Sequence, residues 1–266
     1  MNCILIDRDF LRKEIEELSR RYFKIDLSLT IDYLKIKASL SCEKCYVYTG
    51  RPELKESELS GKEKEFLSAL NAEENKFIGK DGVYYRYGKV TTDGKGDIRQ
   101  KGVDVLLAID AVRILENSSA DRIVIFTGDS DFVPLLDYAL FKGKRVEVFG
   151  SGKTGRDIRG RTDRFHSLNI LSLRDYTRGN ESLFPVIHGF NQFPLSGSKL
   201  ESELKIDHPT FKLYKLQITD YSQFPIKLVS RQPKIILCLN HYSNYTYACG
   251  DDLELVREYL LKTQGL

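Results

Sequence analysis

The chain has 266 residues, enough for one large domain or two modest ones, and its 41% hydrophobic and 30% charged content is that of a folded globular protein. No apolar run is long enough to span a membrane, and the first residues lack the long apolar core of a signal peptide, so we expect a cytoplasmic protein without a membrane partner. A net charge of +3 is too small to indicate nucleic acid by itself, and an odd number of cysteines, five, does not form a secreted disulfide framework.

The chain opens with a strand that ends in an acid. Cys3–Ile6 is a short apolar run closed by Asp7, and helical spacing follows over Phe10–Tyr22. This order predicts a buried strand that leads directly into a helix, with the Asp7 carboxylate at the junction.

The next segments continue the alternation of helix and strand. We expect a helix over about Leu27–Ala38, a strand over Tyr46–Thr49, and a helix over Phe66–Leu70 after a charged stretch. Cys42 and Cys45 have the spacing of half a zinc site, but no second pair has matching spacing, so zinc is not expected.

The strand predicted over Val83–Val90 alternates aromatic and polar residues and includes Arg86 and Lys89. Aromatic side chains next to cations can stack on single-stranded RNA. They are also ordinary strand formers, and packing is the favoured interpretation. Residues 93–96 form a glycine-containing turn that we expect to flank the functional site.

A second acid, Asp104, begins the next predicted helix. Gly102 breaks the preceding segment, and the apolar run after it predicts a helix with Asp104 in or beside its first turn. Asp110 lies six residues later, about 240° around the helix, so it should face elsewhere and act structurally.

The most informative segment is the apolar run Ile123–Phe126 followed by Thr-Gly-Asp-Ser-Asp. Such a run closed by a glycine turn predicts a buried strand of a parallel sheet, with Asp129 and Asp131 just past its carboxyl end. Oxygen ligands of this kind suit Mg²⁺ or Mn²⁺. The alternative is that one of the two acids only caps the following helix.

Three separate segments therefore supply acids that can meet at one edge of a sheet. We predict an α/β fold with a doubly wound, mainly parallel sheet flanked by helices, in which the strand before Asp7 lies beside the strand before Asp129. Capping alone does not predict that Asp104 would join them.

The order of these motifs resembles the NYN-domain (LabA-like) branch of the PIN-like ribonucleases. The resemblance covers roughly residues 1 to 175 and is strongest over Lys101–Ala111 and Thr127–Leu135; Lys142–Phe149 and the pair Asp163 and Phe165, before a strand expected over Ile170–Leu173, also fit. It implies a compact α/β fold and metal-dependent cleavage of RNA. It further implies that the catalytic, metal-binding acids are Asp7, Asp104, Asp129 and Asp131.

The chain departs from this family at two positions. The family has a small residue directly after its first acid and an asparagine three places after it, whereas this chain has Arg8 and Phe10. Either Asp9 substitutes as a ligand or Phe10 stacks on a base; otherwise the departure weakens catalysis.

Clustered cations suggest where an RNA backbone would be contacted. Lys101 precedes the helix of Asp104, and the glycine-containing loop after the strand ending at Phe149 contains Arg156, Arg159 and Arg161. Glycine and lysine in this loop resemble a phosphate-binding composition but lack the Walker A spacing. A solvated surface loop without a role is the alternative.

Residues 1–178 are expected to form the nuclease domain, and residues 179–266 a small α+β accessory domain. The second region contains an alternating strand around Tyr214–Ile218, a buried strand over Ile235–Leu239 and a last helix with a capping box at Asp251–Glu254. It has no catalytic pattern; it binds RNA, forms a homo-oligomer or contacts another protein.

Three functions compete on this evidence. The first is a metal-dependent endoribonuclease that hydrolyses phosphodiester bonds, and the second is a noncatalytic RNA-binding or assembly module on the same fold. The third is a haloacid dehalogenase-like phosphatase with Asp7 as nucleophile. The third is least favoured because it gives the Lys101–Ala111 block no role.

Overall fold

A computed structural model describes residues 2–24, 29–77, 80, 82–93, 97–116, 120–179, 181–190, 197–223, 232–242 and 244–266. The chain divides into two compact units, one made of Met1–Glu17 with Ser28–Arg178 and the other of Leu18–Leu27 with Gly179–Leu266. We call them the N-terminal and C-terminal units. The predicted fold class is confirmed: a mainly parallel sheet with helices, followed by a C-terminal antiparallel sheet.

The N-terminal unit is built on a seven-stranded sheet with the order β5-β4-β3-β1-β6-β7-β8. All pairs are parallel except β4 with β5, so β1 lies at the centre with β3 and β6 as neighbours. The predicted pairing of the first strand with the strand before Asp129 is therefore confirmed. The strands are β1 (Asn2–Asp7), β3 (Lys44–Arg51), β4 (Val83–Thr92), β5 (Ile98–Lys101), β6 (Arg122–Phe126), β7 (Arg145–Gly150) and β8 (Arg164–Ser167).

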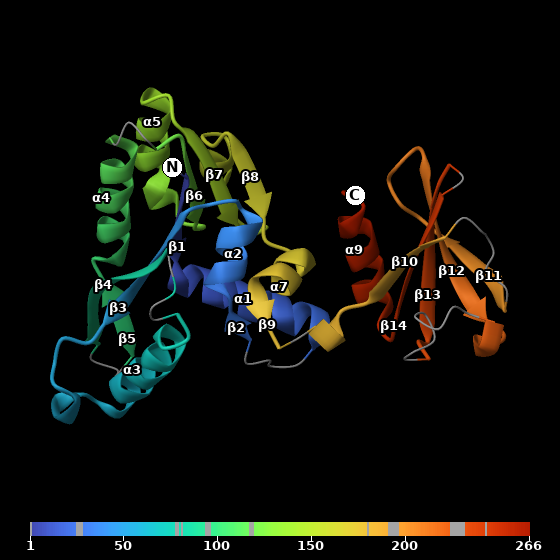
Figure 1. The fold of residues 1–266 in the computed structure, drawn as a ribbon, viewed down its shortest axis with the longest axis horizontal. Helices are drawn as coiled ribbons and strands as arrows, with labels where there is room; N and C mark the ends of the chain where they lie inside the picture. The colour runs from blue at the N-terminus through green and yellow to red at the C-terminus, as the bar shows by residue number, and fades with distance from the viewer. Residues whose placement is uncertain are drawn as a thin grey trace. The chain divides into compact units, whose positions relative to one another are not determined.

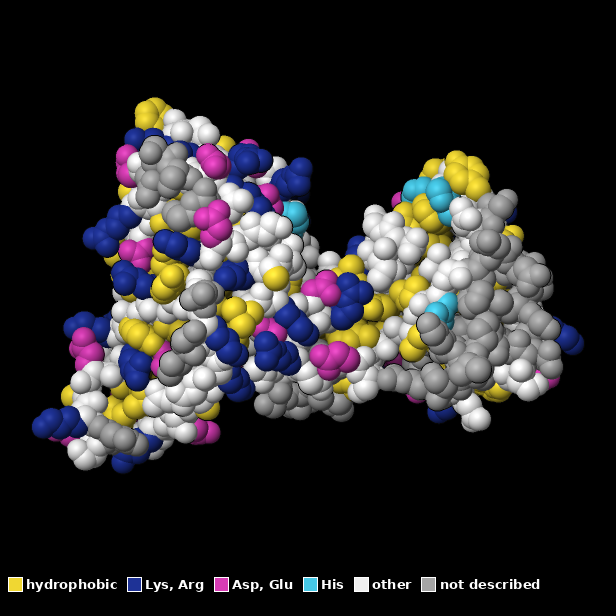
Figure 2. All heavy atoms as spheres, in the orientation of Figure 1, with side chains coloured by type: hydrophobic (Ala, Val, Ile, Leu, Met, Phe, Trp, Pro, Cys, Tyr) yellow, Lys and Arg dark blue, Asp and Glu magenta, His cyan; other side chains and the backbone are white. Residues whose placement is uncertain are grey.

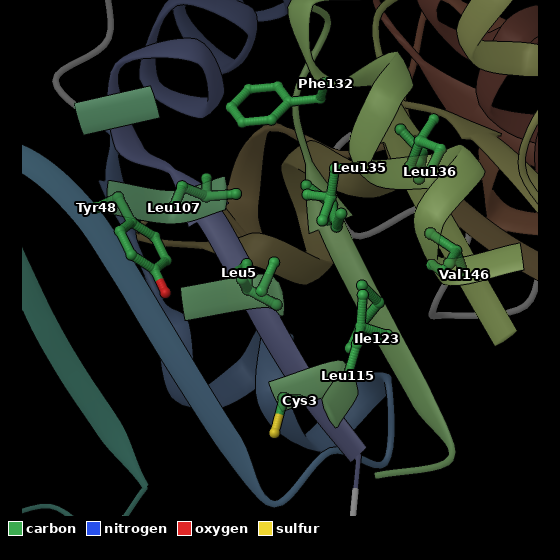
Figure 3. Close-up of a cluster of buried hydrophobic side chains, with 14 of the residues drawn as sticks. Cys3, Leu5, Tyr48, Leu107, Leu115, Ile123, Phe132, Leu135, Leu136 and Val146 are labelled. Atoms are coloured by element: carbon green, nitrogen blue, oxygen red, sulfur yellow. The ribbon is translucent and has the colours of Figure 1, made fainter. Parts of the chain in front are cut away.

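Helices lie on both faces of this sheet, as Figure 1 shows. Helices α4 and α5 pack on the face that carries Cys3, Leu5 and Ile123, and their apolar side chains complete one core (Figure 3). On the other face Phe126 and Phe149 contact Tyr176 of α7. The helices are α1 (Arg8–Phe23), α2 (Tyr33–Ser39), α3 (Gly61–Glu74), α4 (Val103–Glu116), α5 (Val133–Phe141), α6 (Arg156–Arg159) and α7 (Ile170–Tyr176), with 3₁₀ turns η1 (Glu56–Glu58) and η2 (Ser130–Phe132).

Helix α2 is shorter than the sequence predicts. Thr30 and Ile31 form β2, which pairs with β9 (Thr177–Arg178), and α2 begins only after Asp32. The Asp32 carboxylate accepts hydrogen bonds from the Leu34 and Lys35 amides, so this N-cap fixes the helix start.

Helix α3 is longer than predicted and begins inside the charged stretch. Ser60 and Glu63 form a capping box, each side chain accepting from the other residue's amide.

The strand predicted over Ile170–Leu173 is wrong; these residues begin α7. Asn169 accepts a hydrogen bond from the Leu171 amide, and Ser172 accepts one from the Asn169 amide. This reciprocal cap converts a short apolar run into a helix, and β8 is the last strand of the parallel sheet.

The C-terminal unit is an antiparallel sheet with the order β10-β14-β13-β12-β11, covered on one face by α9. The expected strands and last helix are present, and a further strand, β10, lies in a stretch predicted as loop. Tyr22, at the end of α1, donates a hydrogen bond to Glu258 of this unit. The elements are β10 (Val186–Phe190), β11 (Ser198–Leu204), β12 (Phe211–Ile218), β13 (Ile235–His241), β14 (Asn244–Gly250) and α9 (Leu253–Thr263), with η3 (Glu181–Leu183) and η4 (Tyr221–Gln223).

All five cysteines are buried and none forms a disulfide: Cys3, Cys42 and Cys45 lie in the N-terminal unit and Cys238 and Cys249 in the C-terminal unit. Burial raises the pKa of Cys42 to about 11 and that of Cys238 to about 12. Within the described ranges, no helix is long and apolar enough to cross a membrane.

Candidate active site at the carboxyl edge of the sheet

Parallel strands place their carboxyl ends at one edge of the sheet, where sites of open α/β folds are built. Asp7 ends β1, and Asp129 and Asp131 follow the neighbouring strand β6. Helix α4 packs on β1, β3 and β4 and presents Asp104 in its first turn. The topology thus brings all four predicted acids to the same edge.

Asp7 is half-buried where β1 turns into α1. Its Oδ1 accepts a hydrogen bond from the Phe10 amide at 3.1 Å, so the carboxylate caps the helix. Burial raises the pKa of Asp7 to about 6, the charges of Asp9 and Asp104 add to the rise, and the Phe10 hydrogen bond opposes it.

Asp104 is brought to the edge by a tight turn. Gly102 has a φ of 73°, in the left-handed region that glycine tolerates, and its carbonyl accepts the first helical hydrogen bond from Leu106. Burial raises the pKa of Asp104, and the charges of Asp129 and Asp131 raise it further. The negative charge of Asp104 therefore interacts both with Asp7 and with the two acids after β6.

Asp129 and Asp131 are exposed and joined by a local turn. The Asp129 amide donates to Thr127 Oγ1 at 3.2 Å, and Asp129 Oδ1 accepts from the Asp131 amide at 2.9 Å. Asp129 thus caps η2, as the alternative interpretation of the sequence required. A carboxylate has two oxygens, so a cap does not preclude a second interaction.

The donor chemistry of this edge fits a hard divalent cation, since all four side chains are carboxylates. In the described part of the chain, however, no three His, Cys, Asp or Glu side chains come together closely enough to hold a metal ion. Burial is the main cause of the raised pKa of Asp7 and Asp104, and repulsion from the neighbouring acids adds to it. The agreement with a divalent cation therefore rests on the chemistry of the four carboxylates and on their electrostatic interaction, not on a preformed set of ligands.

Residues 71–170 match the model of the NYN domain family. This part of the chain is an NYN domain. The NYN domain is PIN-like, so this part of the chain has the fold of the PIN-like nucleases. The match contains Asp104, Asp129 and Asp131 and excludes Asp7, which the sheet places beside them. No curated protein matches the chain.

Arg8, one of the two departures from the family pattern, is a structural residue. It is buried, and its Nε and Nη2 donate to the two Glu73 oxygens at 2.9 and 2.8 Å. Tyr33 and Tyr85 also donate to Glu73 Oε1. The third guanidinium nitrogen, Arg8 Nη1, lies 3.6 Å from Asp9 Oδ1. Arg8 therefore ties the start of α1 to α3, a role that short-range sequence patterns did not reveal.

Phe10, the second departure, lies against the turn that precedes Asp129. A Cβ at Gly128 would come within 2.8 Å of the Phe10 ring, so the absence of a side chain at Gly128 makes room for it. The ring fills space next to the site where the family pattern has an amide.

The predicted RNA-contacting cations differ in their surroundings within the NYN domain. Arg159 donates to the carbonyls of Ser151, Gly152 and Thr154, and thereby orders the loop after β7. Arg161 pairs with Asp137 at 3.0 Å. Lys101 and Arg156 are exposed.

Asp110 faces away from the acidic edge, as the helical spacing indicates. It is buried and accepts from Arg86 Nε at 2.8 Å and from Nη2 at 3.2 Å. The Arg86 guanidinium, predicted to interleave with aromatics, thus anchors β4 to α4. Residues 94–96, expected to flank the site, lie outside the described residues.

Proposed function

We propose that this protein is a metal-dependent endoribonuclease whose catalytic and metal-binding residues are Asp7, Asp104, Asp129 and Asp131. The observation that supports it best is that β1, α4 and the turn after β6 each bring an acid to the same edge of one sheet, in a unit that contains the NYN match. Bound Mg²⁺ or Mn²⁺ would invert the negative field of this edge, which otherwise repels a phosphodiester, and would supply activation of water. A cytoplasmic location is part of the same proposal.

The residues of the chain would then have the following roles. Asp104 and Asp129 would hold the cation, and Asp7, whose carboxylate accepts from the Phe10 amide, would complete the donor set from β1. Asp131 would serve as a further metal ligand or orient one of the other ligands. Thr127 Oγ1 fixes the backbone of Asp129 and so its approach to the edge.

The test is cleavage of labelled single-stranded and structured RNAs by the purified full-length protein with Mg²⁺, Mn²⁺ or EDTA. We expect metal-dependent cleavage that falls by at least about 100-fold in Asp129→Asn. Glu65→Gln, which removes one exposed charge from α3, is the matched control and should cleave like the wild type.

A noncatalytic RNA-binding module is the second candidate. It is favoured by Arg8 and Phe10, the two departures from the family pattern, because Arg8 pairs with Glu73 and Phe10 packs beside Gly128. Tight RNA binding by the folded wild type without cleavage under any metal condition would establish this candidate and reject the nuclease.

A further inference from the structure

An open groove of about 640 Å³ lies at the same carboxyl edge of the sheet, on the side of β3, β4 and β5. Its walls are formed by Arg51 at the end of β3, Tyr87–Lys89 of β4, Lys101 of β5, and Val105 and Ile109 of α4. We call it the α4 groove. It is not part of the acidic cluster but begins one residue from it, because Val105 follows Asp104 on the first turn of α4.

The apolar wall of the α4 groove is uncovered. Val105 is 62% exposed and Ile109 44% exposed, and the two lie one helical turn apart on the same face of α4. Tyr87, across the groove on β4, is 39% exposed. Its ring stacks with that of Tyr85 at 6.4 Å between centroids, and the Arg51 guanidinium lies 5.0 Å from its centroid. The ring is therefore held in place, and the residue remains partly exposed.

The groove carries an excess of positive charge. Its lining contains Arg51, Lys89 and Lys101 against a single carboxylate, Glu53. Glu53 pairs with Lys89 at 3.0 Å, and Glu74, which is not in the lining, pairs with Arg51 at 3.2 Å. Lys89 and Lys101 stand directly opposite each other in the antiparallel β4–β5 pair. Like charges at such a position repel, so an anion bound between them is favoured. Lys101 has no carboxylate within ion-pair distance among the described residues.

We infer that the α4 groove binds an unpaired nucleotide of single-stranded RNA, with the base against Tyr87 and the apolar wall and the phosphate at Lys101 and Lys89. The identity of the strand rests on the proposed nuclease function. An aromatic ring, an apolar wall and two adjacent cations are what an unstacked base and its backbone require, and paired bases could not reach the ring. An apolar face of a protein helix would suit the apolar wall but would leave Lys101 without an anion, since only Lys89 is paired with a carboxylate, Glu53.

The location of the groove places the bound nucleotide beside the proposed active site. Figure 2 shows that Lys and Arg are interspersed with Asp and Glu over the face of the N-terminal unit that it draws. A net charge of +3 also gives little general attraction for RNA. Local contacts must therefore position the substrate, and the α4 groove would hold the nucleotide next to the phosphodiester that reaches Asp104.

The binding experiment uses the full chain in EDTA, so that neither metal nor cleavage is required. Fluorescence anisotropy with an unstructured, labelled RNA compares the wild type with Tyr87→Leu, Tyr87→Phe and Val105→Glu. We expect Tyr87→Leu to weaken binding about tenfold and Tyr87→Phe to retain the affinity, because stacking needs the ring and not the hydroxyl. Val105→Glu, at an exposed position that should not affect folding, is expected to weaken binding at least as much.

Two matched controls separate the groove from general surface effects. Tyr84, 45% exposed on the same strand and stacked on Tyr46, does not line the groove, and Tyr84→Leu should bind like the wild type. Lys101→Ala should lower the slope of log affinity against log salt by about 0.7, as expected for one lost phosphate contact to a single strand, and Lys64→Ala on α3 should not.

Equal loss of affinity in Tyr87→Leu and Tyr84→Leu, or equal affinity of the wild type for duplex and single strand, would overturn the inference. So would a wild-type dimer that Val105→Glu dissociates without any change in RNA affinity, since the groove would then be a protein interface. Cleavage by the wild type with unaltered binding in all groove variants would reject the groove and keep the nuclease. RNA binding that depends on the groove residues, without cleavage, would keep the groove and reject the nuclease.

Discussion

Asp7 serves the fold and the proposed chemistry at a cost to stability. The carboxylate caps α1, yet burial and the charges of Asp9 and Asp104 raise its pKa from 3.8 to about 6. Because the folded state binds this proton more tightly than the unfolded state, the group is neutral in its effect below about pH 4, where both states are protonated. As the pH rises through about 6, its ionisation lowers the free energy of unfolding by up to about 3 kcal/mol.

Asp7→Asn should therefore stabilise the protein at pH 8 while abolishing cleavage. The asparagine oxygen can still accept from the Phe10 amide, and the buried charge is gone. Thermal unfolding at pH 8 and pH 4 checks this: we expect a higher melting temperature for the variant at pH 8 and little difference at pH 4. An equal loss of stability at both pH values would show that the charge is not the source of the penalty.

Arg8 and Glu73 form the next residue-scale test. Their side chains are 6% and 17% exposed, so removal of one partner leaves the other charge poorly solvated. Arg8→Ala and Glu73→Ala should each lower the free energy of unfolding by about 3–5 kcal/mol, and the double variant by less than the sum. Urea unfolding measures all three.

Arg12→Ala is the control for this pair, since Arg12 and Glu16 form an exposed ion pair on the same helix, 46% and 44% exposed. Its effect should stay below about 0.5 kcal/mol. Additive losses in the Arg8 and Glu73 variants would contradict a direct coupling between them.

The site could be predicted from sequence only where its signals are local. Asp129 and Asp131 follow a buried strand, and Asp104 follows a glycine break, so their positions relative to an element were readable. Arg8 pairs with a residue 65 positions away, and Tyr33 and Tyr85 join from two further elements. A local pattern cannot identify such a partner.

At the scale of elements, the strands of the parallel sheet were predictable because they are short, apolar and closed by turn residues. The errors over α2, α3 and α7 fall at helix starts, which depend on caps. Asn169 with Ser172 is a weak capping signal, and the β-branched Ile170 favoured a strand. Ser60 with Glu63 is a strong one, but it lies in a charged stretch with little apolar periodicity.

Close approach of β4 to the start of α4 gives an element-scale prediction. A Cβ at Gly88 would lie 2.6 Å from the Lys101 carbonyl oxygen and 2.8 Å from Val103 Cγ2. Gly88→Ala should therefore push α4 from the sheet, lower the free energy of unfolding by about 1–3 kcal/mol and reduce cleavage through displacement of Asp104.

Gly61→Ala provides the comparison, because nothing lies within 4 Å of its added Cβ and the residue begins α3. It should be neutral or slightly stabilising. If both variants unfold at the same urea concentration, the contact at Gly88 is not limiting.

At the scale of the whole molecule, the end of α1 belongs to the C-terminal unit although the rest of the helix belongs to the N-terminal one. Phe23 packs edge-on against Phe184 at 5.4 Å, and Lys24 pairs with Asp252 at 2.7 Å. A boundary drawn at Arg178 in the linear sequence therefore separates residues that pack together.

A fragment ending at Arg178 should expose Tyr22 and Phe23 and associate with itself. We expect strong binding of a hydrophobic dye and a concentration-dependent sedimentation coefficient, both reduced by Phe23→Ser in the same fragment. A monomeric fragment that does not bind the dye would show that these contacts contribute little.

The five buried thiols provide built-in reporters of opening. A thiol reacts with an alkylating reagent only when solvent reaches it and its proton can leave, and burial opposes both. Cys3, Cys42 and Cys45 would be modified only as the N-terminal unit opens, and Cys238 and Cys249 only as the C-terminal unit opens. Peptide mass mapping after timed alkylation would thus give each unit its own opening rate in the unmodified wild-type chain, without any engineered probe.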